Sequence, residues 1–177
     1  ILVGITAGAT LGCLAVWIQW REGTPITAFP VYGHGRIFGL HMMVGTMTGL
    51  ALLIEARTKR LETLLAGVAA AIACGGLFWA GGRSGLAGIA AGILLWFWRS
   101  SPDIRKAILQ RGGLVIGAGF VMSWLHWSPE PYLGWWTAAA RTSAATTGNE
   151  LASTRLDFWK ATWNKFSETP WLGRGAN

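Results

Sequence analysis

Long apolar stretches separated by short polar segments fill most of the chain. A helix needs roughly 20 apolar residues to cross the hydrocarbon of a bilayer, and five stretches approach that length. The fourth, from Ser84 to Trp98, is short and must include Gly81 and Gly82 or thin the bilayer locally. The pattern predicts an all-α fold, a polytopic transmembrane bundle within residues 1–127, with helices at about 1–20, 37–54, 61–80, 81–98 and 112–127.

Residues 128–177 contain no further spanning stretch and predict a loop with one amphipathic helix at about 154–168. Thr154 can cap that helix, Asp157 lies in its first turn, and Pro170 ends it. Spacings of three and four residues put four large side chains on one face: Leu156, Trp159, Trp163 and Phe166. Such a helix can lie on a membrane surface or form the lid of a subdomain, and both interpretations stay open.

Composition supports a membrane protein. The 177 residues are 52% hydrophobic and only 13% charged, about half the charged fraction typical of a soluble domain. Twelve Trp residues fit the boundary between hydrocarbon and headgroups. The net charge of +7 is scattered over short loops, so no basic face exists for nucleic acid. Cys13 and Cys74 lie inside apolar stretches without metal-ligand spacing, and we expect neither a metal nor a cofactor.

The basic residues also predict an orientation. Seven lie in the loops after the second and fourth helices, whereas the other short loops hold only Arg21, Arg36 and Arg83. By the positive-inside rule the seven face the cytoplasm, which places Arg83 and residues 128–177 on the opposite side of the membrane. Tryptophans at the predicted helix ends agree with two interfacial belts, the outer one formed by Trp17, Trp20, Trp79, Trp124 and Trp127.

Three arginines are candidates for anion binding, because a charge at the hydrocarbon boundary is costly without a partner. Arg83 follows Gly82 at the outward start of the fourth helix, where small neighbours and the helix N-terminus suit phosphate or pyrophosphate. Arg155 opens the amphipathic helix one turn before Trp159, and Arg36 opens the second helix. The alternatives are a snorkelling Arg83 that anchors a helix end and an Arg155 stacked on Trp.

The remaining chemistry is sparse. His34, His41 and His126 could shuttle protons near neutral pH, but no carboxylate lies at a telling spacing. We expect His41 to be packed within a helix and His126 to be interfacial, whereas the role of His34 stays open. Small residues recur in the last two predicted spans and favour close helix packing: Gly81, Gly85, Gly88 and Gly92, then Gly113, Gly117 and Ala118.

Three segments, taken in order, resemble the O-antigen ligase and polymerase superfamily of bacterial polysaccharide membrane enzymes. The first is Gly82-Arg83-Ser84-Gly85, similar to a small-Arg-small signature whose more familiar order is Ser-Arg-Gly. The second is Arg155-Leu156-Asp157-Phe158-Trp159, and the third is Pro170-Trp171-Leu172-Gly173-Arg174-Gly175. The resemblance covers residues 36–177.

The resemblance implies a GT-C-like, multi-pass glycosyltransferase of the bacterial inner membrane that takes a glycan from undecaprenyl pyrophosphate on the periplasmic side. The acceptor would be the lipid A core, another glycan or a protein, and no metal is implied. Arg83 and Arg155 would be the catalytic pair, with Arg36 and Trp159 as further substrate-binding residues. The family usually has a downstream loop histidine, which would lie beyond Asn177, so we expect a truncated fragment that is inactive alone.

Two other classes of function stay open. A transporter could bind a translocated anion through Arg83 and Arg36, although its spans would more readily carry buried charges or prolines. A structural protein could use the aromatic helix to dock a partner. A downstream histidine in the complete protein would favour transfer, and internal repeats would favour transport.

Overall fold

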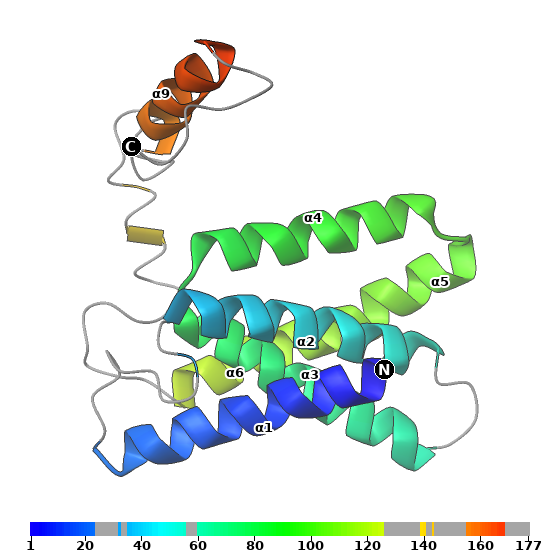
Figure 1. Ribbon diagram of the computed structural model, residues 1–177. Coiled ribbons are helices and arrows are strands. Elements are labelled where there is room, and N and C mark those ends of the chain that lie inside the picture. The colour runs from blue at the N-terminus through cyan, green and yellow to red at the C-terminus, as the bar shows by residue number, and fades with distance from the viewer. Residues whose placement is uncertain are drawn as a thin grey trace. The chain divides into compact units, whose positions relative to one another are not determined.

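The computed structural model describes residues 1–23, 32, 35–55, 60–125, 139–140, 143 and 155–168. It forms two compact units, Ile1–Ala138 and Ala139–Asn177. The first contains α1 (Leu2–Arg21), α2 (Gly35–Glu55), α3 (Arg60–Ala80), α4 (Arg83–Arg99), α5 (Pro102–Ala107), a π-helical turn η2 (Ile108–Gly112) and α6 (Gly113–Leu125) (Figure 1). The second contains α9 (Arg155–Glu168). The all-α fold class predicted from the sequence is confirmed.

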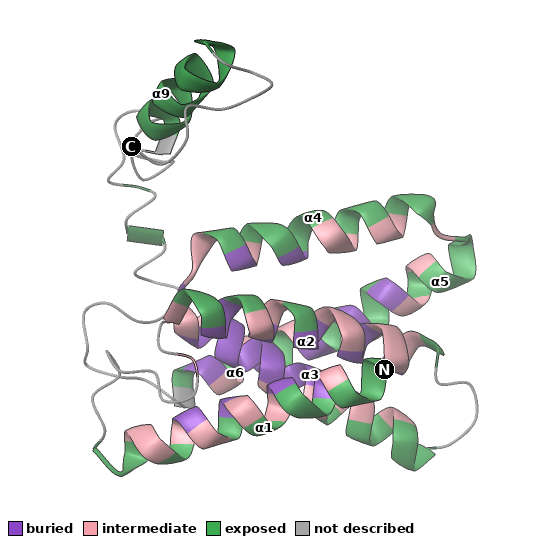
Figure 2. Ribbon diagram, viewed as in Figure 1, coloured by how far each residue is buried: buried purple, intermediate pink, exposed green. Residues whose placement is uncertain are grey.

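Four helical segments are long and apolar enough to cross a membrane among the described residues. They are α1, α2, α3 and the continuous stretch Pro102–Trp124. The α4 helix has 17 residues, and its crossing of the membrane stays a prediction. Many large apolar residues are exposed, among them Leu64, Leu94 and Leu114, which are 62%, 68% and 75% exposed. Exposed positions recur along the α4 ribbon in Figure 2. Outward-facing leucines on helices that are apolar all round fit a hydrocarbon solvent.

Close contacts between small residues show how neighbouring helices run. A Cβ on Gly45 would clash with Ala9 of α1, and one on Gly49 would lie 2.8 Å from the Ala70 Cβ of α3. Gly45 also lies near Ala73 and Gly49 near Thr6, so residue numbers fall along α1 and α3 as they rise along α2, and α2 is antiparallel to both. The α4 helix runs alongside α2 in the same direction (Figure 1), with Gly85, Gly88 and Gly92 packed against Leu77, Met43 and Met47. Because glycine has no side chain, the helix backbones can approach closely at these positions.

The glycine prediction for the last span needs a correction. Gly113 and Gly117 have no described atom within 4 Å of an added Cβ, so they pack against no neighbouring helix that the structure describes. Gly119 packs instead, because its Cβ would lie 2.7 Å from the Cβ of Cys74 and 2.9 Å from the amide of Gly75. A shift of two residues along a helix moves a side chain to another face, which the apolar pattern alone does not reveal.

Hydrogen bonds from polar side chains also connect the helices. The hydroxyls of Thr6 and Thr48 lie 2.9 Å apart across α1 and α2. At the opposite end from Arg83, Arg105 donates to the carbonyls of Phe97 and Trp98, both at 3.0 Å, and Arg111 donates to Leu53 at 2.6 Å. These guanidinium groups cover carbonyls at the C-termini of α4 and α2, where the helix dipole favours a positive charge.

One tryptophan assigned to the interfacial belt is a core residue. Trp79 is only 2% exposed, whereas Trp124 and Trp98 are 54% and 75% exposed. Trp127 lies outside the described residues. Since a tryptophan at a helix end fits either a lipid boundary or a protein core, the sequence position alone did not separate the two.

Candidate functional site

A tight turn of two glycines carries the first candidate residue. The amide of Gly81 donates to the carbonyl of Phe78 at 3.2 Å, which closes α3. Gly81 has φ +61°, a left-handed conformation that strains any residue with a side chain. Gly82 is the N-cap of α4, with φ −79° and ψ 108°. The chain therefore reverses within two residues, and Arg83 is the first residue of α4.

Arg83 combines a fixed positive charge with a helix N-terminus. Its side chain is half-buried, and its Nη1 atom is shielded from solvent. The first turn of α4 contains no acidic residue, so nothing in that turn offsets the positive end of the helix dipole. A guanidinium at a helix N-terminus has the charge and the donor geometry for a phosphate group.

Arg36 lies at the same end of the bundle as Arg83. It is exposed and occupies the first turn of α2, which also contains no acidic residue. The two helices meet where an added Cβ on Gly85 would lie 3.6 Å from the carbonyl oxygen of Gly39. Because α2 and α4 run in the same direction, two helix N-termini and two arginines gather there. We call this region, defined by Arg36, Gly39, Gly82, Arg83 and Gly85, the arginine end.

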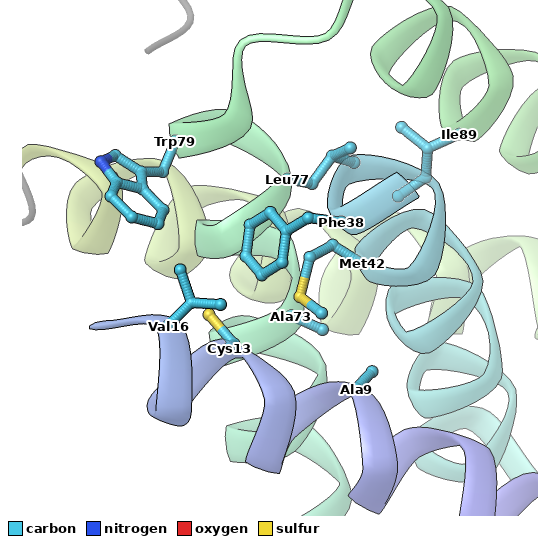
Figure 3. Close-up of a cluster of buried hydrophobic side chains, with 9 residues drawn as sticks. All are labelled: Ala9, Cys13, Val16, Phe38, Met42, Ala73, Leu77, Trp79 and Ile89. Carbon is cyan, nitrogen blue, oxygen red and sulfur yellow. The ribbon is translucent and has the colours of Figure 1, made fainter. Parts of the chain in front are cut away.

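An aromatic cluster of Trp20, Tyr32, Phe38 and Trp79 lies next to the turn. The Trp79 ring meets Phe38 edge-on, with centroids 6.0 Å apart at 90°, and Trp20 at 6.1 Å and 66°. Tyr32 packs against Phe38 at 5.3 Å and 75°. Figure 3 shows Trp79 and Phe38 together with Leu77 and Met42 in the core. Edge-to-face packing of this kind holds rings in fixed positions, and Trp79 precedes Gly81 by only two residues.

The cluster also holds the one histidine that the described residues contain. The hydroxyl of Tyr32 lies 2.7 Å from Nδ1 of His41, so His41 is packed within a helix as expected. Burial raises the pKa of Tyr32, and Cys13 adds to the rise, so the phenol stays protonated at neutral pH. His34 and His126 lie outside the described residues. The described residues hold no group of three His, Cys, Asp or Glu side chains suited to a metal ion.

Arg155 and Trp159 belong to the second unit. Arg155 is the first residue of α9, and Trp159 follows one turn later with 63% of its surface exposed. The structure thus brings Arg36 and Arg83 to one end of the first unit and places Arg155 and Trp159 on one helix of the other. A pairing of Arg83 with Arg155 stays a prediction.

The supporting residues Phe38, Trp79 and Tyr32 were missed by the sequence analysis. One signal was available for Trp79, which lies four residues before Arg83 and beside the glycine turn. No comparable signal existed for Phe38 or Tyr32, because their ring contacts join different parts of the chain.

Comparison with known proteins adds one match. The model of a protein family described as O-antigen ligase matches residues 68–177, which is more than half of the chain and includes Arg83, Arg155 and Trp159. No curated protein and no solved structure matches the chain significantly.

Proposed function

We propose that the arginine end of this chain, which belongs to the O-antigen ligase family, binds the pyrophosphate of a lipid-linked glycan donor. The family acts as glycan ligases, and the donor we propose is undecaprenyl pyrophosphate carrying an oligosaccharide or polysaccharide. The observation that carries the proposal is Arg83 itself, half-buried at the start of α4 after the two-glycine turn. A planar guanidinium in a water-poor setting suits a pyrophosphate at the membrane boundary, because it can donate two parallel hydrogen bonds.

The chemistry follows from where charge develops. In transfer, an acceptor oxygen forms a bond to the anomeric carbon of the glycan while the bond from that carbon to the pyrophosphate oxygen breaks. The acceptor hydroxyl gives its proton to a base, and the lipid pyrophosphate leaves with additional negative charge. Arg83 and the N-terminus of α4 would stabilise that charge, and preorganised donors of this kind lower the barrier. Arg155, Arg36 and Trp159 would complete the substrate site.

The proposed side of the membrane is the periplasm. The guanidinium groups of Arg105 and Arg111 cover helix ends at the opposite end from Arg83. Both residues lie in the basic segment between α4 and α6, which the sequence pattern and the positive-inside rule assign to the cytoplasmic side. The arginine end would then face the periplasm of a bacterial inner membrane. The acceptor, whether the lipid A core, another glycan or a protein, would define the subtype.

A reconstituted transfer assay tests the proposal. Full-length protein in vesicles is given an undecaprenyl pyrophosphate glycan and each candidate acceptor, with EDTA present and nucleotide omitted. We expect transfer to proceed, because the pyrophosphate ester is already an activated donor and arginine supplies the positive charge.

The same preparation separates the rival function. Movement of the lipid-linked glycan or of a free anion across the vesicle membrane, without a new glycosidic bond, would contradict transfer and support a transporter. Formation of the glycosylated acceptor identifies the subtype directly.

A further inference from the structure

The α9 helix carries a broad exposed aromatic face. Its large apolar side chains are mostly open to solvent within its unit: Leu156 37%, Phe158 71%, Trp159 63%, Trp163 67% and Phe166 53% exposed. The rings of Trp163 and Phe166 also contact each other, with centroids 5.7 Å apart. A contiguous patch of this size on a 14-residue helix marks an interaction surface, because water solvates it poorly.

The charges of α9 are arranged around that face. With 3.6 residues per turn, Lys160 falls beside Leu156 at one edge and Lys165 falls beside Phe158 at the other. Asp157 and Glu168 fall on the opposite side of the helix. Lys165 lies 3.7 Å from Glu168, with their side chains 65% and 44% exposed. Lysines therefore border the aromatic face and carboxylates point away from it.

This arrangement suits a lipid surface better than a protein groove. A helix that docks in a groove presents a narrow strip of anchors. Here the apolar arc runs from Phe158 through Trp159 to Leu156 and covers nearly half of the helix. Wide aromatic faces bordered by lysines are typical of helices that lie at the boundary of an anionic bilayer.

The place of α9 in the sequence explains why a bilayer surface is close to it. The last described helix of the first unit, α6, ends at Leu125, at the same end of the unit as Arg83, and α9 begins at Arg155. A segment that follows a spanning helix this closely stays near the bilayer, so the lipid is present at high local concentration. We propose that α9 binds flat on an anionic leaflet with its aromatic face in the headgroup region.

The docking has a consequence for the donor site. Trp159 follows Arg155 by about one helical turn, so the two positions lie on the same side of α9. Binding of α9 to the bilayer would therefore hold Arg155 at the depth of the lipid phosphates. This consequence rests on the proposed function, whereas binding of α9 to the bilayer does not. Docked in this way, α9 would recognise the donor as part of a membrane surface.

Fluorescence quenching of labelled α9 tests the proposal. In the full chain, Cys13 and Cys74 are first replaced by alanine. Single cysteines are then placed at Thr162, on the aromatic side of α9, and at Asn164, on the opposite side. Each is labelled with an environment-sensitive dye in vesicles of phosphatidylcholine and phosphatidylglycerol. We expect headgroup nitroxide lipids to quench the Thr162→Cys label several-fold more than the Asn164→Cys label, with iodide giving the reverse order.

The outcomes are distinct. Equal quenching of the two labels, or protection of the Thr162→Cys label from both quenchers, would overturn the proposal, the latter in favour of a protein contact. Lys160→Gln with Lys165→Gln should reduce the quenching in anionic vesicles and leave it unchanged in phosphatidylcholine alone. The measurement needs no donor, so normal docking without transfer would contradict the proposed function only, and normal transfer without docking would contradict this inference only.

Discussion

Replacing Arg83 by alanine in the full-length protein is expected to lower glycan transfer by ~100-fold to ~1,000-fold, the usual cost of losing one preorganised donor to a developing negative charge. Arg83 is half-buried at the N-terminus of α4, where solvent screens its charge less than at an open surface. The helix should still form, because alanine favours helices. Initial rates of transfer from the lipid-linked donor provide the measurement.

Two further variants make the Arg83 result specific. Arg83→Lys keeps the charge but loses the planar pair of donors, and we expect intermediate activity. Arg99→Ala removes an arginine from the last turn of the same helix, far from the turn of Gly81 and Gly82, and should leave transfer unchanged. Wild-type rates in Arg83→Ala would remove Arg83 from the mechanism, and an equal loss in Arg99→Ala would indicate a general effect of charge.

Trp79→Ala is expected to destabilise the protein by about 3–5 kcal/mol, the range for emptying a buried large aromatic site. Trp79 is 2% exposed and makes edge-to-face contacts with Phe38 and Trp20. The cavity would lie beside the turn that starts α4, so we also expect the KM for the donor to rise. Thermal unfolding in detergent and steady-state kinetics measure the two effects.

Matched variants separate packing at Trp79 from the loss of any tryptophan. Trp79→Phe preserves an aromatic ring and should recover most of the stability. Trp98→Ala removes a ring that is 75% exposed and should cost little. A donor KM that stays at the wild-type value in Trp79→Ala, at a temperature where the variant is folded, would contradict support of the arginine end by this ring.

The helical fold class followed from simple physics, since apolar stretches of this length have few alternatives in a membrane. Which face of each helix packs against a neighbour did not follow. These helices are apolar all round, so hydrophobic periodicity cannot distinguish a face that meets lipid from one that meets protein. Gly117 and Gly119 illustrate the problem, because they differ by two positions and only Gly119 packs against Cys74 and Gly75 of α3.

The candidate site was likewise predictable only in part. The Gly81-Gly82-Arg83 sequence predicted an arginine at a helix start, and the positive φ of Gly81 explains why the turn needs glycine there. The sequence analysis offered Arg36 only as a further substrate-binding residue, and the close approach of Gly39 and Gly85 is what places the two helix starts together. The aromatic support from Phe38 and Tyr32 depends on long-range contacts that no local pattern encodes. The catalytic roles of the arginines stay predictions.

The central claim is that the arginine end recognises the pyrophosphate of a lipid donor, and a binding series tests it most directly. Full-length protein in nanodiscs is titrated with undecaprenyl pyrophosphate, undecaprenyl phosphate and undecaprenol, and each Kd is measured for wild type and Arg83→Ala. We expect wild type to bind the pyrophosphate more tightly than the alcohol by about tenfold or more, as charge-assisted hydrogen bonds provide, and Arg83→Ala to lose most of that preference. Equal affinity of wild type for all three lipids, or an unchanged preference in Arg83→Ala, would contradict the account.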